Sequence, residues 1–393
     1  MKEEKYLFSL QNRGIKLGLD RTKKLLLECG SPHKNIKTIQ ILGTNGKGST
    51  SAILANILKH NNYKIGLYTS PHLFSFTERI RINGQPIDSN SVKHFLKKYK
   101  RVIEKIEASF FEVMTVMALW NFNRCKVDYA IMETGLGGKF DSVTACESDF
   151  FGITSISKDH QNILGNNLKD IAHEKVAAIK EKSFVWSVKQ KNNVNKIIQD
   201  HCIEKQCELN EVKTNFNLNL SLMGNHQKEN ASLAISIAKH LLSNPKNIEK
   251  ALMSTKWFGR NQVIQTKPYI IFDVAHNEEG VRSFLNVIGK KNHKFNKKYL
   301  LLSIQKTKNI NSIASELNKY FDHIFYTITD KEKSMGFKQL KKSIHDIKFI
   351  ENAEDAIDHL LSISQKDDSI SIIGTHFWGE IIEKKFNISF DNL

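Results

Sequence analysis

The stretch Gly43-Thr44-Asn45-Gly46-Lys47-Gly48-Ser49 decides the fold of this chain of 393 residues. It follows the apolar run 39–42 and leads into a helical stretch at 50–59. A strand, a glycine-rich turn and a helix start form a cradle for phosphate, because backbone N–H groups and the helix dipole face the anion. Lys47 can reach the β- and γ-phosphates of a nucleotide, and the Ser49 hydroxyl can bind Mg²⁺. The sequence therefore predicts a nucleotide-binding domain of the P-loop type.

The spacing of the residues in this loop distinguishes between families of nucleotide-binding proteins. It is not the common G-x-x-x-x-G-K-[ST] form, because position 41 is isoleucine rather than glycine. The compressed G-T-N-G-K-x-S form resembles the ATP loop of the Mur ligase superfamily, and the trailing Gly48-Ser49 is most similar to its folate branch, the folylpolyglutamate and dihydrofolate synthases. Such enzymes activate a carboxylate as an acyl phosphate and couple it to the amine of an amino acid. The alternative is a glycine turn that precedes a helix by chance.

Length and composition are those of an ordinary globular protein. The chain is long enough for two or three domains, each with its own core. Hydrophobic residues make up 40% of it, and no apolar run approaches the roughly 20 residues that a membrane span needs. Residues 1–5 are charged, and no apolar signal-peptide core follows them. The five cysteines are scattered without a paired zinc spacing. We therefore expect a cytoplasmic monomer with reduced thiols and no membrane partner.

The formal net charge of +17 is the one bulk property that points to a nucleic-acid partner. Lysine outnumbers arginine, however, and comes with abundant asparagine and isoleucine, a composition that A/T-rich codon usage produces on its own. The basic runs at 97–101 and 290–298 contain no helix-turn-helix or RNP pattern. We expect no nucleic-acid partner, and a basic field that attracts ATP, glutamate and folates. A nucleic-acid-stimulated NTPase remains the alternative outside the ligases.

Apolar spacing alternates between helix and strand along the first 260 residues. It predicts helices at 17–30, 50–60, 111–123, 168–180 and 230–243, and strands at 37–42, 64–69, 127–132 and 151–156. The segment 184–222 is rich in lysine and asparagine and predicts small strands at the edge of a sheet. After a boundary near 257–265, further strands are predicted at 269–272, 299–303, 323–327 and 369–373. Strands separated by helices are typical of α/β proteins with parallel sheets.

The predicted fold class is therefore α/β with two domains. Residues 1–262 form a P-loop-type ATPase domain with a mainly parallel sheet, which by resemblance also carries the folate-binding loop. Residues 263–393 form a smaller, Rossmann-like C-terminal α/β domain, which by resemblance is the glutamate ligase domain.

A carboxylate follows the apolar strand 127–132. Glu133 lies at the carboxyl end of this strand, where α/β sheets bind their ligands, and it precedes a Gly-Leu-Gly-Gly run. With Ser49 nearby, it is a natural Mg²⁺ ligand. The family pattern E-x-G-L-G-G-R-x-D supports this role, although Lys139 replaces the usual arginine.

The next strand leads to two further metal candidates. The pattern Asp-His…Leu-Gly…Glu-Lys from 159 to 175 matches the family, and by resemblance His160 binds a second Mg²⁺. Lys175 lies beside the apolar stripe of a predicted helix, so its amine is partly desolvated and nucleophilic toward CO₂. The resemblance implies that Lys175 is carbamylated and helps to hold the second metal; a lysine that reaches solvent is the alternative.

Three later motifs are assigned by resemblance. Gly224-Asn225-His226-Gln227 with Asn230 is similar to G-x-H-Q-x-x-N-A, in which Gln227 and Asn230 meet the adenine. Trp257-Phe258-Gly259-Arg260 is similar to W-P-G-R, and Arg260 suits the γ-phosphate during transfer. Residues 272–277 resemble D-G-A-H-N, which places Asp273 at the ribose or nucleotide and His276 near the incoming glutamate.

The substrate-binding residues are likewise assigned by resemblance. The folate branch has T-S-P-H-L followed by E-R-I, which match Ser70, Pro71, His72 and Arg79, and its G-S matches Gly374-Thr375. The resemblance implies ATP as co-substrate, two Mg²⁺ sites and a monovalent cation, with Lys47, His160, Lys175 and Arg260 as catalytic residues. Dihydropteroate, a folate, or both remain open as the carboxylate substrate, and another Mur-type amide ligase is the alternative within the superfamily.

Overall fold

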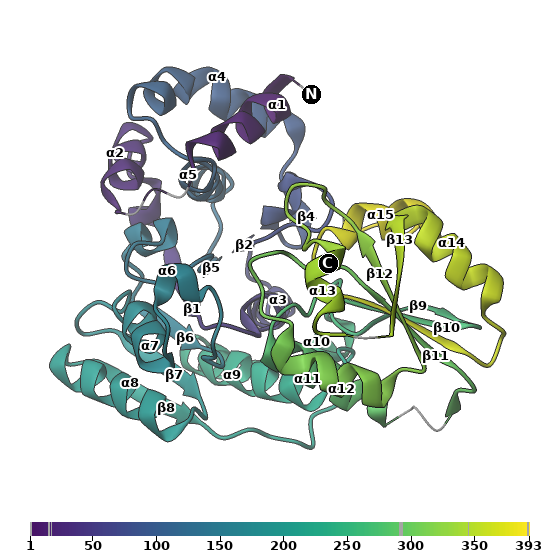
Figure 1. Cartoon of the computed structure of the whole chain (residues 1–393). Helices are drawn as coiled ribbons and strands as arrows, with labels where there is room; N and C mark the ends of the chain where they lie inside the picture. Colours follow the sequence, from purple (N-terminus) through teal and green to yellow (C-terminus); the bar gives the residue numbers. More distant parts are fainter. Residues whose placement is uncertain (1, 15, 17, 291–293, 345, 391–392) are drawn as a thin grey trace.

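Two β-sheets organise the chain, one in each predicted domain (Figure 1). The computed structural model describes residues 2–14, 16, 18–290, 294–344, 346–390 and 393. The first sheet has the strand order β4-β3-β2-β5-β1-β6-β7-β8 and the second β13-β12-β11-β14-β10-β9. This is the two-domain α/β architecture that the sequence predicts.

The first-domain strands are β1 (Lys37–Leu42), β2 (Ile65–Tyr68), β3 (Ile80–Ile82), β4 (Gln85–Pro86), β5 (Tyr129–Glu133), β6 (Phe150–Ile153), β7 (Phe184–Val188) and β8 (Glu208–Val212). Its helices are α1 (Lys2–Ser9), α2 (Asp20–Glu28), α3 (Lys47–Lys59), α4 (Ser89–Lys105), α5 (Phe110–Arg124), α6 (Gln161–Leu164), α7 (Leu168–Val176), α8 (Asn192–Glu204), α9 (Asn225–Leu241) and α10 (Ile248–Ser254). Single 3₁₀ turns lie at Leu10–Arg13, Pro32–Asn35, Phe76–Arg79 and Ser142–Cys146.

Strand β1 lies inside the first sheet and positions the nucleotide loop. It pairs in parallel with β5 on one side and β6 on the other, and all but its first residue are buried. Because parallel strands end at the same edge, the loops that follow β1, β5 and β6 meet there. Among the described strands of this sheet, the short β3 pairs antiparallel with both of its neighbours, β2 and β4, and so runs against the others.

Helices cover both faces of the first sheet. Side chains of α3, α9 and α10 form one core with the face that presents Ile39, Ile41 and Ile131. On the other face, α2, α4 and α5 pack over the half around β2 and β5, while α7 and α8 pack over β6 and β7. A parallel sheet covered on both faces explains why its strands read as continuous apolar runs.

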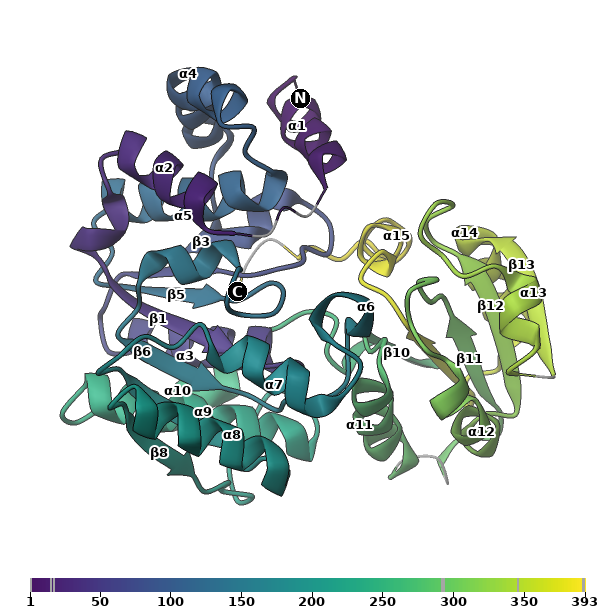
Figure 2. The same cartoon turned by 60° about the vertical axis from the view of Figure 1, so that its left-hand side comes forward.

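The second domain lies beside the first and repeats this plan at smaller size (Figure 2). Its strands are β9 (Gln262–Thr266), β10 (Tyr269–Asp273), β11 (Lys298–Leu302), β12 (His323–Ile328), β13 (Ile347–Asn352) and β14 (Ser369–Ile373), and its helices are α11 (Glu278–Gly289), α12 (Asn311–Tyr320), α13 (Phe337–Lys341), α14 (Ala353–Ile363) and α15 (Trp378–Phe386). All strands are parallel except the edge strand β9. Helices α11 and α12 cover one face, and α14 and α15 cover the other.

Several predicted boundaries differ from the structure. Helix α3 begins at Lys47 rather than at 50, because Gly46 adopts the left-handed conformation and lets the helix start inside the loop. The segment 184–222 contains helix α8 between β7, which lies inside the sheet, and the edge strand β8, and residues 216–220 form no strand. The sequence analysis also missed the amphipathic helix α4. Leu17, where the first predicted helix was to begin, lies outside the described residues.

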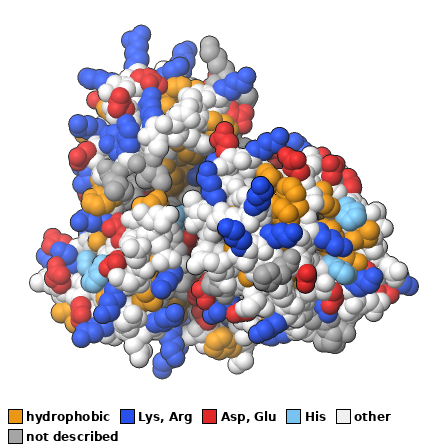
Figure 3. All heavy atoms as spheres, viewed as in Figure 1, with side chains coloured by type: hydrophobic (Ala, Val, Ile, Leu, Met, Phe, Trp, Pro, Cys, Tyr) orange, Lys and Arg blue, Asp and Glu red, His pale blue; other side chains and the backbone are white. Residues whose placement is uncertain are grey.

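Two surface features concern the expected absence of membrane and nucleic-acid partners. No helix in the described part of the chain is both long and apolar enough to cross a membrane. Lysine and arginine side chains are spread over the visible face of both domains (Figure 3).

Candidate active site

One cleft brings together most of the residues that the sequence singles out. It encloses about 1320 Å³, open mouth included, where the carboxyl ends of β1, β5 and β6 face β10 and α11. The predicted residues that line it are Gly43–Ser49, Ser70, Pro71, Glu133, His160, Lys175, Gln227, Asn230, Arg260, Asp273 and His276. Ser49, Glu133, His160 and Lys175, predicted as metal ligands from three separate segments, thus line the same cavity.

The P-loop is shaped by close packing at Gly46. Its φ of 88° is in the left-handed region, and a Cβ there would lie 2.2 Å from Oδ1 of Asn230. Lys47 is folded back over the loop, where its Nζ donates to the carbonyl oxygens of Gly43 (3.2 Å) and Thr44 (3.0 Å). Burial lowers the pKa of Lys47. An anion in the cradle would restore a charged partner to this amine.

Ser49 and Glu133 fit a divalent cation. The Ser49 hydroxyl is buried and has no hydrogen-bond partner. Glu133 is buried as well; its Oε2 accepts from the Ser70 amide at 3.0 Å, and burial raises its pKa. A hydroxyl and a carboxylate are oxygen ligands of the kind that Mg²⁺ prefers. No group of three or more His, Cys, Asp or Glu residues that could hold a metal occurs within the described residues. A metal here would therefore use a mixed set of ligands.

Lys175 lies on α7 with its side chain directed into the cleft. Only 5% of the residue is exposed, and its Nζ donates to the Gly43 carbonyl at 2.8 Å. Burial lowers its pKa to about 7, with a smaller contribution from Lys47. The loop after β5 approaches α7 closely, since a Cβ at Gly138 would lie 2.5 Å from the Lys175 carbonyl oxygen. At neutral pH a large share of Lys175 is therefore the uncharged amine, the form that reacts with CO₂.

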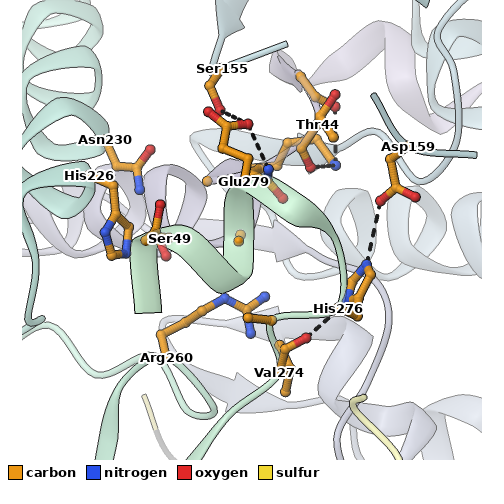
Figure 4. Close-up of a pocket in the computed structure, with 18 of the residues that line it drawn as sticks. Thr44, Ser49, Ser155, Asp159, His226, Asn230, Arg260, Val274, His276 and Glu279 are labelled. Carbon is orange, nitrogen blue, oxygen red and sulfur yellow. Dashed lines mark hydrogen bonds and ion pairs between the residues drawn. The ribbon is translucent and has the colours of Figure 1, made fainter. Parts of the chain in front are cut away.

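His160 begins α6 in the left-handed conformation, with φ of 49°, and is partly exposed at the cleft. Burial lowers its pKa to about 4, so it is neutral at pH 7 and can act as a ligand. Its neighbour Asp159 crosses the cleft to the second domain. Asp159 accepts from Lys308 Nζ (2.6 Å) and Asn277 Nδ2 (3.0 Å) and lies 3.5 Å from His276 Nε2 (Figure 4).

The sequence analysis missed Asp159 and Lys308 as site residues. The position of Asp159 directly before His160 was the available signal. Lys308 lies in the segment Lys306-Thr307-Lys308, which resembles a blurred form of the family's lysine-aspartate pair, but only the fold brings it to Asp159, 149 positions away.

The start of α9 forms the side of the cleft away from His160. Gln227 and Asn230 are buried there, and Asn230 Nδ2 donates to Gln227 Oε1 at 3.1 Å. Glu279, on α11, reaches over the P-loop and accepts from Asn45 Nδ2 at 2.9 Å (Figure 4). Glu279 is a third site residue that the sequence analysis missed.

The linker between the domains carries Arg260. This side chain lines the main cleft and a second cavity of about 570 Å³ that also contacts Pro71, His276 and His376. Asp273 holds the linker in place: its two carboxylate oxygens accept from the amides of Asn261 and Ala275, both at 2.7 Å. Each of these oxygens keeps a further lone pair and Asp273 lines the cleft, so its contact with the ribose or nucleotide stays a prediction.

Three predicted substrate-binding residues do not line the main cleft. Arg79 Nε donates to His72 Nδ1 at 2.9 Å, so these two side chains bind each other beside the core of the first domain. Burial lowers the pKa of His72 to about 3. Thr375 is buried, and its hydroxyl accepts from the Phe377 amide at 3.3 Å. Its neighbour His376, rather than Thr375, reaches the second cavity.

The chain is similar in sequence to known proteins. Residues 259–376 match the family model "Mur ligase, glutamate ligase domain". The chain is 32% identical over 402 residues to the dihydrofolate synthase/folylpolyglutamate synthase of Bacillus subtilis, which covers 92% of each protein.

Solved structures of the same kind share the fold. Escherichia coli FolC in complex with DHPP and ADP has a TM-score of 0.90 at 25% identity and covers 98% of this chain and 97% of its own. A bifunctional folylpolyglutamate synthase/dihydrofolate synthase from Yersinia pestis, complexed with AMPPNP and Mn ion, has a TM-score of 0.88 at 24% identity, with 98% and 97% covered.

Proposed function

The chain belongs to the dihydrofolate synthase/folylpolyglutamate synthase family, and we propose that its cleft joins L-glutamate to the carboxylate of a pteroate or folate. The protein is an ATP-dependent ligase with a Mur-type glutamate ligase domain. One observation carries the assignment of the site: Lys47, Ser49, Glu133, Lys175 and Arg260 from distant segments line a single cleft. Such a cleft can bind a nucleotide, hold a cation and stabilise a phosphoryl group in transfer.

The first step is phosphoryl transfer to the acceptor. An oxygen of the substrate carboxylate attacks the γ-phosphorus of ATP, ADP leaves, and an acyl phosphate forms. Negative charge increases at the transferring group, and Lys47 and Arg260 are the cations that neutralise it there. Lys47 must leave the Gly43 and Thr44 carbonyls to do so, which is a rotation of a flexible side chain.

Ser49 and Glu133 would hold Mg²⁺ at the phosphates, and Glu133, His160 and Lys175 would hold a second ion. When bound, the cations supply Lewis-acid polarisation of the phosphoryl oxygens. The buried amine of Lys175 becomes a suitable anionic ligand once CO₂ has added to Nζ with loss of a proton. Burial and a pKa of about 7 support this carbamylation.

The second step is amide formation. The amine of glutamate attacks the acyl carbon, phosphate leaves, and the ammonium proton passes to solvent or to a nearby base. His276 and Arg260 border the second cavity, where they would meet the carboxylates of the amino acid. Closure of the second domain over the cleft would exclude water, which otherwise hydrolyses the acyl phosphate.

The acceptor is tested by ADP release from purified protein with glutamate and either dihydropteroate or tetrahydrofolate. We propose that both support turnover, as the names of the relatives imply for those proteins. Activity with neither acceptor would overturn the proposed function, and stimulation by RNA or DNA instead would favour a different class of NTPase. Repeating the assay with and without KCl tests the monovalent cation, and light scattering tests the monomer.

The metal site is tested by two serine variants of the same helix. The hydroxyls of Ser49 and Ser51 are both buried without a partner, but only Ser49 lines the cleft. We expect Ser49→Ala to remove the Mg²⁺-dependent part of the thermal stabilisation by AMPPNP, whereas Ser51→Ala keeps it. Equal behaviour of the two variants would exclude Ser49 as a metal ligand.

A further inference from the structure

The loop after β6 contacts the second domain most closely through the carboxylate of Asp159. Asp159 accepts from Lys308 Nζ at 2.6 Å and from Asn277 Nδ2 at 3.0 Å, and His276 Nε2 lies 3.5 Å away. These three groups come from the loop after β11 and from the β10–α11 connection. The side chains of Asp159 and Lys308 are only 10% and 7% exposed. This is a buried ion pair between two domains.

The pair is charged and depends on both partners. Asp159 Oδ1 lies 2.6 Å from Lys308 Nζ, and its Oδ2 lies 3.5 Å from His276 Nε2. A buried ion pair adds little net stability, yet removal of one partner leaves an uncompensated charge and is strongly unfavourable. Separation of the two domains at this point therefore requires solvent to reach both side chains.

The same loop is also tied to the P-loop. The Thr44 hydroxyl donates to the Ser157 carbonyl at 3.0 Å, and Asn45 Nδ2 lies 3.3 Å from the Ser157 hydroxyl. Residues 157–159 thus connect the phosphate cradle on one side with Lys308 and His276 on the other. The cradle also contacts the second domain directly, because Asn277 Nδ2 donates to Asn45 Oδ1 at 2.9 Å, so residues 157–159 are a second connection between the two.

We propose that Asp159 is a positioning residue that holds the second domain closed over the phosphate end of the cleft, and so couples ATP consumption to amide formation. The proposal rests on the ligase function stated above. An acyl phosphate exposed to water is hydrolysed, so ADP forms without product. Closure through Asp159 excludes water and places His276 at the cleft when the amine attacks.

The test measures ADP and amide product in the same reaction. Asp159→Asn and Lys308→Met each keep a side chain of similar size and remove one charge of the pair. We expect the ratio of ADP to amide to rise from about one to several-fold, and the KM for glutamate to rise more than the KM for ATP. The double variant should be no worse than the poorer single variant, because both changes remove the same contact.

Lys306→Met is the matched control. It removes a lysine from the same loop, but this side chain is exposed, and the backbone N–H of Lys306 donates to the Lys333 carbonyl at 2.9 Å. Its ADP-to-amide ratio should equal that of the wild type. A slower but fully coupled Asp159→Asn enzyme, or fully additive effects in the double variant, would overturn the proposal.

A measurement without turnover separates this inference from the proposed function. Small-angle X-ray scattering with AMPPNP and Mg²⁺ should give a larger radius of gyration for Asp159→Asn than for the wild type or Lys306→Met. If the wild type is active but all three proteins have the same radius of gyration, the role of Asp159 is overturned and the proposed function stands. A wild type that forms no amide with either acceptor overturns the function instead.

Discussion

Buried charge governs the chemistry at the scale of single residues. One cleft is lined by four ionisable side chains, Lys47, Glu133, Lys175 and Arg260. Burial lowers the pKa of the three basic groups and raises that of Glu133, so in each case it favours the uncharged form. A folded protein tolerates buried ionisable groups where a bound ligand or a covalent modification offsets the cost of removing them from water. The sequence identified all four by motif, but only the packing shows how far each is removed from water.

Substitution of Lys175 tests whether this buried amine contributes to catalysis as a carbamate. We expect Lys175→Ala to lower kcat on the order of 10²-fold, because the site loses a group that stabilises charge. Small carboxylates such as formate should restore part of the rate if the missing group is a carbamate. Lys169→Ala, an exposed lysine on the same helix, should retain wild-type kcat. A ¹³C resonance from labelled bicarbonate, present in the wild type and absent in Lys175→Ala, checks the modification directly.

The lowered pKa of Lys175, when the amine is unmodified, leads us to expect that the stability of the fold depends on pH. Its pKa is about 7 in the folded chain, against roughly 10.4 when unfolded. Between these values the unfolded chain binds the proton and the folded chain does not, so the free energy of unfolding rises with pH across this window. We therefore expect the Tm of Lys175→Met minus that of the wild type, in CO₂-free buffer, to be greatest near pH 7 and to shrink toward pH 10. A constant difference across this range would contradict the buried amine.

Elements of regular apolar spacing were the most predictable part of the fold. The strands β1, β10 and β14 were predicted nearly to the residue, because strands buried on both faces give continuous apolar runs. Helix α8 was missed, since asparagine, lysine and glutamine between its apolar positions resemble a loop. The start of α3 was placed three residues late because its glycine N-cap depends on a left-handed backbone that composition does not reveal.

The close packing of the P-loop against helix α9 requires a glycine at position 46. Gly46→Ala would put a methyl group 2.2 Å from Asn230 Oδ1 at a φ of 88°. The loop and α9 must then move apart, so we expect ADP affinity to fall about 10-fold or more, with a loss of stability of about 1–3 kcal/mol. Isothermal titration calorimetry and thermal unfolding measure the two effects. Gly336→Ala is the control, because it has a φ of −67° and open space around it; an equal loss there would refute the argument.

At the scale of the whole molecule, the sequence predicted the two domains but not the contacts between them. The predicted boundary at 262/263 lies at the first residues of β9, beside the linker that Asp273 holds. The Asp159–Lys308 pair and the Asn45–Glu279 bond join residues 149 and 234 positions apart. Neither pair has a local pattern, since such contacts follow from the packing of two finished domains.

Arg260 is the residue through which the linker acts on both cavities. Its half-buried side chain lines both of them, and its Nη1 donates to the Gly259 carbonyl at 3.0 Å. Arg260→Lys keeps the charge but loses the planar fork that can contact a phosphoryl oxygen and a carboxylate together. We therefore expect kcat to fall on the order of 10²-fold while the Kd for ADP changes little. Arg282→Lys, at an exposed arginine on α11, should leave both quantities unchanged. If Arg260→Lys weakened ADP binding as much as it slowed turnover, the side chain would serve ground-state binding of the nucleotide, and charge neutralisation during transfer would fall to Lys47 alone.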